Sequence, residues 1–598
     1  MKRAGGIRQS LALAWERRHP CRRNRRSGTT PAGMPALPGQ LQPQPLVNAP
    51  DRGRGLGCLG FLILTLLSAS LARAHVGSPD VFFDGLIGPY PARITIRMPG
   101  VVPGRAEISA RVQAQAPVEV SFLPLYAETP VTNAPPADPG QPVRGETNLY
   151  SGDLWLMSFG AYGIQVRVRG ANGEGAVQIP VNSVATRQLA LPSWLGKLLL
   201  ALGATLFLGG IGIVAAAARD SALAPGVLPG KIEGRKGLLA ATVTLVIFVG
   251  ALAGGKTWWG FEETNFRRHL REGAWPDLAV SVRGANSQRI LQLTLGKKAF
   301  RPNDSIRLVP DHGKLLHVFL VREPGLDAFA HLHPVRVPHS EFGGNTFEAA
   351  LPLLPEGNYK IFCDLTFEDS GLSSTATNSV WLPAFTEAAE QASRLSSGRL
   401  APGTTTAHGT ATAAGGTTAP LEPDPDDSWA SYSPQAVPAA TGANAAFHLA
   451  GGPAVIWKSA WPLRAKQDAG LQFELRDSAG EPLSLEPYMG MMSHAAVLRA
   501  DGAVFAHLHP SGNYSMAAQQ LFDARVQRET QTPGEPPSAV PAMDHSAMGH
   551  AMHHPHSNSG GVSIPYEFPV PGDYRVWVQF KSDGKVLTGV FDAKVVAQ

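Results

Sequence analysis

Short runs of alternating apolar and polar residues make up most of the chain. In its first third they cover residues 92–97, 106–112, 118–123 and 164–168, and turns rich in Pro and Gly separate them. A period of two sends successive side chains to opposite faces, which is typical of strands with one buried face. The pattern therefore predicts short β-strands of the kind that build a β-sandwich.

A Gly-x-Tyr phrase occurs three times, each time just before a late apolar run. The copies are Gly160-x-Tyr162, Gly357-x-Tyr359 and Gly572-x-Tyr574. A tyrosine that enters a late strand after a turn is typical of the tyrosine corner of immunoglobulin-like sandwiches. We therefore expect an all-β fold with three immunoglobulin-like β-sandwich domains, at 75–190, 270–385 and 428–598. Residues 386–427, rich in Thr, Ala, Gly and Pro, are predicted to form a disordered linker.

Two longer apolar runs, 198–217 and 238–254, approach the length needed to cross a bilayer. The loop 218–236 between them carries Arg219, Lys231, Arg235 and Lys236, which predicts that it is cytoplasmic. Tryptophans border the runs at 194, 258 and 259, where interfacial aromatics belong. Residues 194–259 are thus predicted to form two transmembrane helices, with both soluble parts outside the cytoplasm. The competing interpretation is a pair of buried core helices.

The first 74 residues have the features of a signal peptide or leader. A short apolar run, 59–67, precedes Ala72-Arg73-Ala74, which fits the A-x-A cleavage pattern. This leader holds 12 Lys+Arg against 2 Asp+Glu, so the formal charge of +5 becomes −5 for residues 75–598, and the basic balance does not indicate a nucleic-acid partner. Cys363 would be the one cysteine of the mature chain, which rules out an intramolecular disulfide there and predicts a small buried side chain.

The hexapeptide Phe-Ala-His-Leu-His-Pro occurs twice, at 329–334 and 505–510. On a strand, residues i and i+2 share a face, so His331 and His333 should present their imidazoles side by side, as should His507 and His509. The Asp501-Gly502 turn predicts a tight hairpin in which His494 lies opposite His509. A three-residue loop in the first copy would place His317 opposite His333 in the same way.

The two copies also match upstream of the hairpin, with His312 in one where the other has Met489. Imidazole and thioether are both copper ligands, so this exchange favours copper over zinc, although three neutral histidines also suit Zn²⁺. We expect two metal sites, each within one copy, with Met492 as an additional ligand of the second. The first site comprises His312, His317, His331 and His333, and the second comprises Met489, His494, His507 and His509. The alternative for each histidine is a strand residue whose ring nitrogens are satisfied within the fold.

Residues 529–561 interrupt the strand pattern of the last domain with a loop rich in Met and His. Its candidate ligands are Met543, His545, Met548, His550, Met552, His553, His554 and His556. Tracts of this composition are typical of metal binding. Cleavage after Ala74 would also give His75 a free α-amine beside its imidazole, which together can chelate Cu²⁺.

Parts of the chain resemble two groups of bacterial envelope proteins. Residues 154–168 and 355–362 resemble late strands of the YtkA/FixH-like family of membrane-associated, immunoglobulin-like domains. The tract 543–556, with its Met-Asp-His-Ser and Met-x-Gly-His segments, resembles the periplasmic copper-resistance proteins, some of which use a mature N-terminal histidine as a ligand. These resemblances imply a location at the bacterial cytoplasmic membrane, with the soluble domains on the periplasmic or extracellular side.

We therefore expect a membrane-anchored extracytoplasmic protein that sequesters copper or delivers it to a cuproenzyme or metal exporter. One alternative is an enzyme, either a copper oxidoreductase or a zinc hydrolase, built on a three-histidine site with an open coordination position. The sequence has no Ser-His-Asp pattern, phosphate-binding Gly loop or blue-copper Cys-His pairing to support it, and no catalytic residue is assigned. The other alternative is an adhesive or structural scaffold with incidental histidines.

Overall fold

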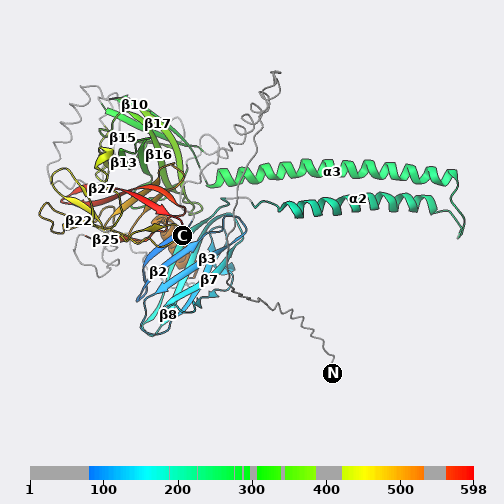
Figure 1. Cartoon of the computed structure of the whole chain (residues 1–598), viewed down its shortest axis with the longest axis horizontal. Coiled ribbons are helices and arrows are strands. Elements are labelled where there is room, and N and C mark those ends of the chain that lie inside the picture. Colours follow the sequence, from blue (N-terminus) through cyan, green and yellow to red (C-terminus); the bar gives the residue numbers. More distant parts are fainter. Residues whose placement is uncertain are drawn as a thin grey trace, which may run out of the picture. The chain divides into compact units, whose positions relative to one another are not determined.

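A computed structural model describes residues 80–186, 189–224, 226–274, 276–285, 288–296, 306–338, 344–384, 421–442, 444–530 and 561–598. The leader, His75 and the Met/His-rich tract 543–556 lie outside these residues. Most of the described chain is β-structure in several sheets, accompanied by two long apolar helices. The expected predominance of β-structure and the apolar helix pair are therefore present (Figure 1).

The first domain consists of two sheets with the strand orders β1-β2-β3-β7-β6 and β5-β4-β8-β9. Its strands are β1 (Val81–Ile87), β2 (Tyr90–Arg97), β3 (Gly104–Val112), β4 (Glu119–Tyr126), β5 (Asp138–Pro139), β6 (Gln141–Pro142), β7 (Leu149–Leu156), β8 (Gly160–Gly170) and β9 (Gly173–Ser183). The alternating burial of β2 and β3 sends one face of that sheet into a core shared with β8 of the other sheet. The four strands expected from the sequence in this region are all present.

The second domain has the strand orders β10-β11-β15-β14 and β17-β16-β12-β13-β18. Its strands are β10 (Asp277–Ala285), β11 (Gln288–Gly296), β12 (His317–Glu323), β13 (Ala328–Leu332), β14 (Val335–Arg336), β15 (Thr346–Ala350), β16 (Gly357–Thr366), β17 (Ser373–Leu382) and β18 (Ser428–Ser431). Strand β18 was expected to begin the last domain, but it pairs with β13 and completes this sheet. Cys363 is fully buried in its core, and burial raises the pKa of its thiol.

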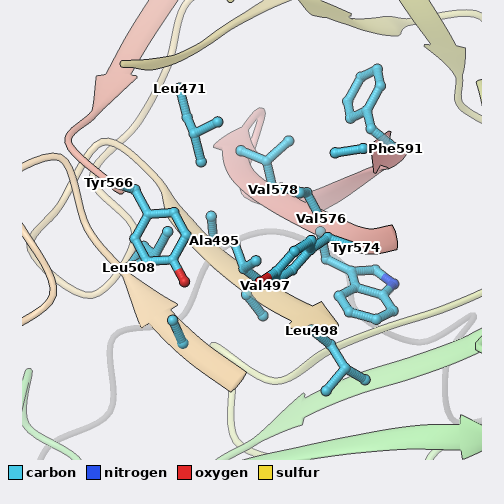
Figure 2. Packing of buried hydrophobic residues seen from close by; sticks show 14 of the residues in the cluster. Leu471, Ala495, Val497, Leu498, Leu508, Tyr566, Tyr574, Val576, Val578 and Phe591 are labelled. Atoms are coloured by element: carbon cyan, nitrogen blue, oxygen red, sulfur yellow. The ribbon is translucent and has the colours of Figure 1, made fainter. Parts of the chain in front are cut away.

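The third domain has the strand orders β19-β20-β22-β25 and β21-β27-β26-β23-β24. Its strands are β19 (Ala445–His448), β20 (Ala454–Trp457), β21 (Leu463–Arg464), β22 (Leu471–Arg476), β23 (His494–Arg499), β24 (Phe505–Leu508), β25 (Gly561–Ile564), β26 (Gly572–Ser582) and β27 (Lys585–Val596). Figure 2 shows Ala495 and Val497 of β23 packed among Val576, Val578 and Leu471 in its core. These aliphatic contacts, together with the pairing of β23 with β26, fix the position of the histidine-bearing hairpin in the domain.

The late tyrosine of each domain hydrogen-bonds to the backbone four residues earlier. The Tyr359 and Tyr574 hydroxyls donate to the carbonyls of Pro355 and Val570, four residues earlier, at 2.9 and 2.7 Å. The Tyr162 hydroxyl accepts from the backbone N–H four residues earlier, at 3.0 Å. A hydrogen bond between tyrosine and the backbone therefore recurs at the start of a late strand in each domain.

Helix α5 (Met516–Thr530) follows the second histidine hairpin and was not expected. Ser515 caps its N-terminus, accepting a hydrogen bond from the Ala518 N–H at 3.1 Å. The Arg525 guanidinium donates to the carbonyls of Tyr126 and Ala127, which joins this helix to the first domain. The predicted loop 529–561 is therefore wrong at both edges, because the helix includes Thr530 and β25 begins at Gly561.

Helices α2 (Ser193–Asp220) and α3 (Lys231–Ala274) run alongside each other (Figure 1), with Phe207 and Phe248 in contact at 5.4 Å between ring centroids. Residues Ser193–Asp220 and Lys231–Phe266 are each long and apolar enough to cross a membrane. Their apolar side chains are largely exposed in the protein itself, which contradicts the alternative of two buried core helices. The second helix continues past the end predicted at residue 259.

Candidate metal centre

Both histidine hairpins have the register that the sequence predicts. Val318 pairs with Leu332 in the first and Ala495 with Leu508 in the second, so His317 lies opposite His333 and His494 opposite His509. The ring centroids within the first copy lie 4.6–5.4 Å apart, and those within the second lie 4.5–5.6 Å apart. Each hairpin therefore presents three converging imidazoles.

The two hairpins face each other. Along β12, Val318 and Leu320 enter the core of their own domain, whereas Phe319 and Val321 belong to a core shared with the third domain. The burial pattern of this strand is accordingly continuous rather than alternating. A strand that is buried on both faces has an uninterrupted apolar run in its sequence. The run Val318 to Val321 is such a signal, and it indicates that both faces of β12 are covered.

Aromatic contacts between the two hairpin sheets come in matched pairs. Phe505 stacks on Phe362 with centroids 4.1 Å apart, and the equivalent Phe329 stacks on Trp577 at 4.9 Å. Phe505 is equivalent to Phe329, and Phe362 is equivalent to Trp577, so each copy makes the same contact with the other copy. Contacts across the two-fold axis of a homodimer are related in this way. The interface therefore brings the histidines of both copies into one cluster.

The nitrogen atoms group across the copies rather than within them. One group comprises His312, His494 and His509, and the other comprises His317, His331 and His507; within each, candidate ligand atoms lie within 4.8 Å of one another. The candidate ligand atoms thus group with those of the other hairpin, whereas the sequence predicted groups within one copy, because the facing sheets place rings of one hairpin next to rings of the other. The ring centroids of His317 and His507 are 5.3 Å apart.

In the second group, two imidazoles each have one nitrogen hydrogen-bonded to an oxygen acceptor, and the third has one nitrogen close to a carboxylate. The Nε2 of His317 contacts the Asp311 carbonyl at 3.0 Å, the Nδ1 of His331 contacts the Gln579 Oε1 at 3.0 Å, and the Nδ1 of His507 lies 3.3 Å from an Asp364 carboxylate oxygen. A neutral imidazole carries one proton, so His317 and His331 donate theirs to these acceptors and each keeps a lone pair on its other ring nitrogen. Hydrogen bonds of this kind orient histidines that bind metals.

The lone-pair nitrogens of His317 and His331 lie 3.2 Å apart. With Gln579 presenting its oxygen to His331, no proton remains to join them. Two nitrogens bound to one ion at about 2.0–2.1 Å lie about 3.3 Å apart in tetrahedral geometry. The observed spacing therefore matches that expected for two ligands of one cation and also lies within hydrogen-bond range.

Several buried ring nitrogens have no hydrogen-bond partner within the described part of the chain. They are both nitrogens of His494, both nitrogens of His509, and the Nε2 atoms of His333 and His507. Buried polar atoms are almost always paired, and a cluster of exceptions indicates a missing ion or water. The alternative of histidines satisfied within the fold therefore does not account for these rings.

The partner residues of the histidines escaped the sequence analysis. Asp364 and Gln579 occupy equivalent positions on β16 and β26, opposite His317 and His494, and each contacts a histidine of the other domain. Asp364 is the single charged residue in the otherwise apolar run 361–365, and this break in the pattern could have marked it from the sequence. Nothing in local sequence marked Gln579.

Asp427, which was assigned to the linker, orients His333. Its carboxylate accepts from the His333 backbone N–H at 2.7 Å and contacts the ring Nδ1 at 3.0 Å. His333, Asp424 and Asp427 form a third group with suitable atoms. The Lys314 ammonium lies 2.6 Å from Asp424 and balances the negative charge of this group. We therefore assign Asp427 to orienting His333 rather than to binding a metal ion.

The upstream turns match closely. His312 and Met489 both have φ of 51°, and each precedes a glycine of positive φ, Gly313 at 81° and Gly490 at 79°. Two successive positive φ angles define a type I′ turn, which glycine tolerates at its second position. Met489 is buried, whereas Met492 is 42% exposed, unlike the histidine rings.

The metal-free cluster should lose stability in acid. Burial first, and neighbouring imidazoles second, hold the pKa values of His317, His331, His494 and His509 well below their ordinary value. In the unfolded chain they titrate near about 6.5, so below that pH the unfolded state binds more protons than the folded state. Stability is full above about pH 6.5 and falls as the pH drops. We expect the denaturation midpoint of chelator-treated full-length protein to decrease steadily from pH 7.5 to 5; a flat profile would contradict buried neutral rings.

Comparisons with known proteins identify no function for the chain. A family described as a domain of unknown function (DUF8832) matches residues 449–534 and 540–597, which lie in the third domain. No curated protein matches the chain.

Three solved structures are similar to it at low identity. Latent PorU from Porphyromonas gingivalis is 8% identical, with 87% of this chain and 34% of that chain covered and a TM-score of 0.13. Salmonella alpha-2-macroglobulin is 9% identical, with 87% and 24% covered and a TM-score of 0.15. The FN1–FN3 domains of chicken CNTN1 are 7% identical, with 84% and 97% covered and a TM-score of 0.12. The chain spans about a third of the first and a quarter of the second.

Proposed function

We propose that the chain is a membrane-anchored metal-binding protein that sequesters the ion or passes it to another protein. The observation that carries the proposal is the second histidine group. In it, His317 and His331 each donate a ring proton to an oxygen acceptor, His507 lies beside the Asp364 carboxylate, and candidate ligand nitrogens of the three rings lie within 4.8 Å of one another. Sharing of ligands between two domains suits a site that is formed and broken by small domain movements.

Copper is the favoured ion, with zinc as the alternative. The nitrogen donors accept either ion. The Met/His tract 543–556 adds thioethers, which favour copper, and its resemblance to copper-resistance proteins points the same way. The two apolar helices would anchor the protein in the membrane, with the domains, proposed to be of immunoglobulin type, on the extracytoplasmic side.

The proposal predicts that the amount of bound metal depends on the buried histidine rings. Full-length protein in detergent is incubated separately with Cu²⁺ and Zn²⁺, desalted and measured by mass spectrometry. We expect bound metal, with copper retained when both ions compete. His331→Phe combined with His507→Phe should lower the bound metal by at least one ion per chain.

A second variant separates the buried rings from the Met/His tract. It carries His545→Ser, His550→Ser, His553→Ser, His554→Ser and His556→Ser, and it should keep the metal of the buried cluster. If the phenylalanine variant retains as much metal as the parent in this background, the proposal is wrong and the scaffold interpretation stands.

A further inference from the structure

The two histidine groups adjoin each other. His312 of the first group lies 6.1 Å from His317 of the second between ring centroids, and His494 lies 5.6 Å from His507. Each group supplies three nitrogens, fewer than the four ligands of a closed tetrahedral site. Two ions held here would be close neighbours, and each would keep a coordination position that the three histidines leave open.

A cavity of about 190 Å³ opens onto both groups. His317 and His507 of the second group and His509 of the first line it, together with Asp311 and Asp364. Its far wall comes from the first domain, through Asn182 and Val184. The Asn182 side chain donates to the Ser373 carbonyl at 2.7 Å, which fixes this wall to the second domain. The cavity is large enough for a water molecule or a small anion and reaches a ligand ring of each group.

We infer that the two groups together hold a pair of metal ions, one from each group, and that the cavity admits a small exogenous ligand that bridges them. The inference rests on the proposed function and adds to it a second ion and a binding position for a small molecule. Ligands for each ion come from both domains, so neither domain forms the pair alone. A cavity on the open side of a three-histidine ion is the arrangement that allows exchange of a fourth ligand.

The test uses Cu²⁺ and azide with the full chain that carries the five serine replacements in the Met/His tract. We expect two copper ions per chain and a half-field transition in the electron paramagnetic resonance spectrum, which requires two close spins. Azide should add a charge-transfer band and reduce the integrated spin signal, because a bridging ligand couples the two ions. His494→Leu should leave one copper and remove the half-field transition.

Two tryptophan variants test the cavity. Val184→Trp fills it from the first domain without altering a ligand. Val570→Trp is the control, at a valine that is 36% exposed and is not among the residues that line the cavity. We expect Val184→Trp to keep both copper ions but to weaken azide binding at least tenfold, with the control unchanged. One copper per chain, two copper ions without a half-field transition, or unweakened azide binding in Val184→Trp overturns the inference and leaves the proposed function intact. Absence of bound copper overturns both.

Discussion

Replacing His494 by leucine is expected to stabilise the metal-free protein. This ring is fully buried, and neither nitrogen has a partner among the described residues. An unpaired buried polar atom costs about 1–3 kcal/mol, whereas leucine is apolar and similar in volume. We expect the free energy of unfolding of His494→Leu to rise by about 1–3 kcal/mol without metal, while metal binding by the first group is lost. Denaturation with and without Cu²⁺ measures both effects.

His331→Leu is the matched control for that variant. The His331 ring is equally buried, but its Nδ1 donates to the Gln579 Oε1 at 3.0 Å. Its removal leaves the Gln579 oxygen without that partner, so the metal-free protein should be destabilised. If both substitutions lower the free energy of unfolding of the metal-free protein, His494 is a structural residue and not a metal ligand whose burial destabilises the fold.

Replacing Phe505 by alanine is expected to weaken folding and metal binding together. Phe505 is 1% exposed and lies between the two hairpin sheets, stacked on Phe362 and 5.2 Å from Phe319. Removing a buried phenylalanine costs about 3–5 kcal/mol. Because each histidine group draws on both domains, loosening this interface should also lower copper affinity by at least tenfold, as measured by competition with a chelator.

Phe473→Ala separates the two effects. Phe473 is also 1% exposed, but it packs on Trp457 and Phe591 inside the third domain, away from the hairpin interface. We expect a similar loss of stability with copper affinity retained at temperatures where the protein stays folded. Equal losses of affinity in both variants would contradict a site that depends on contact between the domains.

Local sequence predicted the hairpins well because their register follows from nearby residues. The Asp501-Gly502 turn fixes which residue faces which, and side-chain alternation then places His494, His507 and His509 on one face. The first copy needed only a three-residue loop to reach the same pairing. These inferences required no knowledge of the rest of the chain.

The grouping of the histidines could not be obtained in this way. It depends on the face-to-face packing of two sheets, and nothing local specifies which distant surface covers Phe319 or Phe505. The partners Asp364 and Gln579 are separated from their histidines by 143 and 248 residues. Asp427, which contacts His333, comes from the segment predicted to be a linker. That segment has few large apolar residues, so nothing in its sequence indicated that its last residues are ordered.

The matched stacking of Phe362 on Phe505 and of Trp577 on Phe329 has a consequence for how the protein can be divided. The second and third domains face each other as the two subunits of a homodimer do, and they form two halves of one polypeptide. Either half produced alone would expose an apolar, imidazole-bearing sheet to water, with nothing to prevent two such halves from associating. Expression of single domains would therefore yield self-paired species with an artificial arrangement of ligands, and work on the centre requires both halves in one polypeptide.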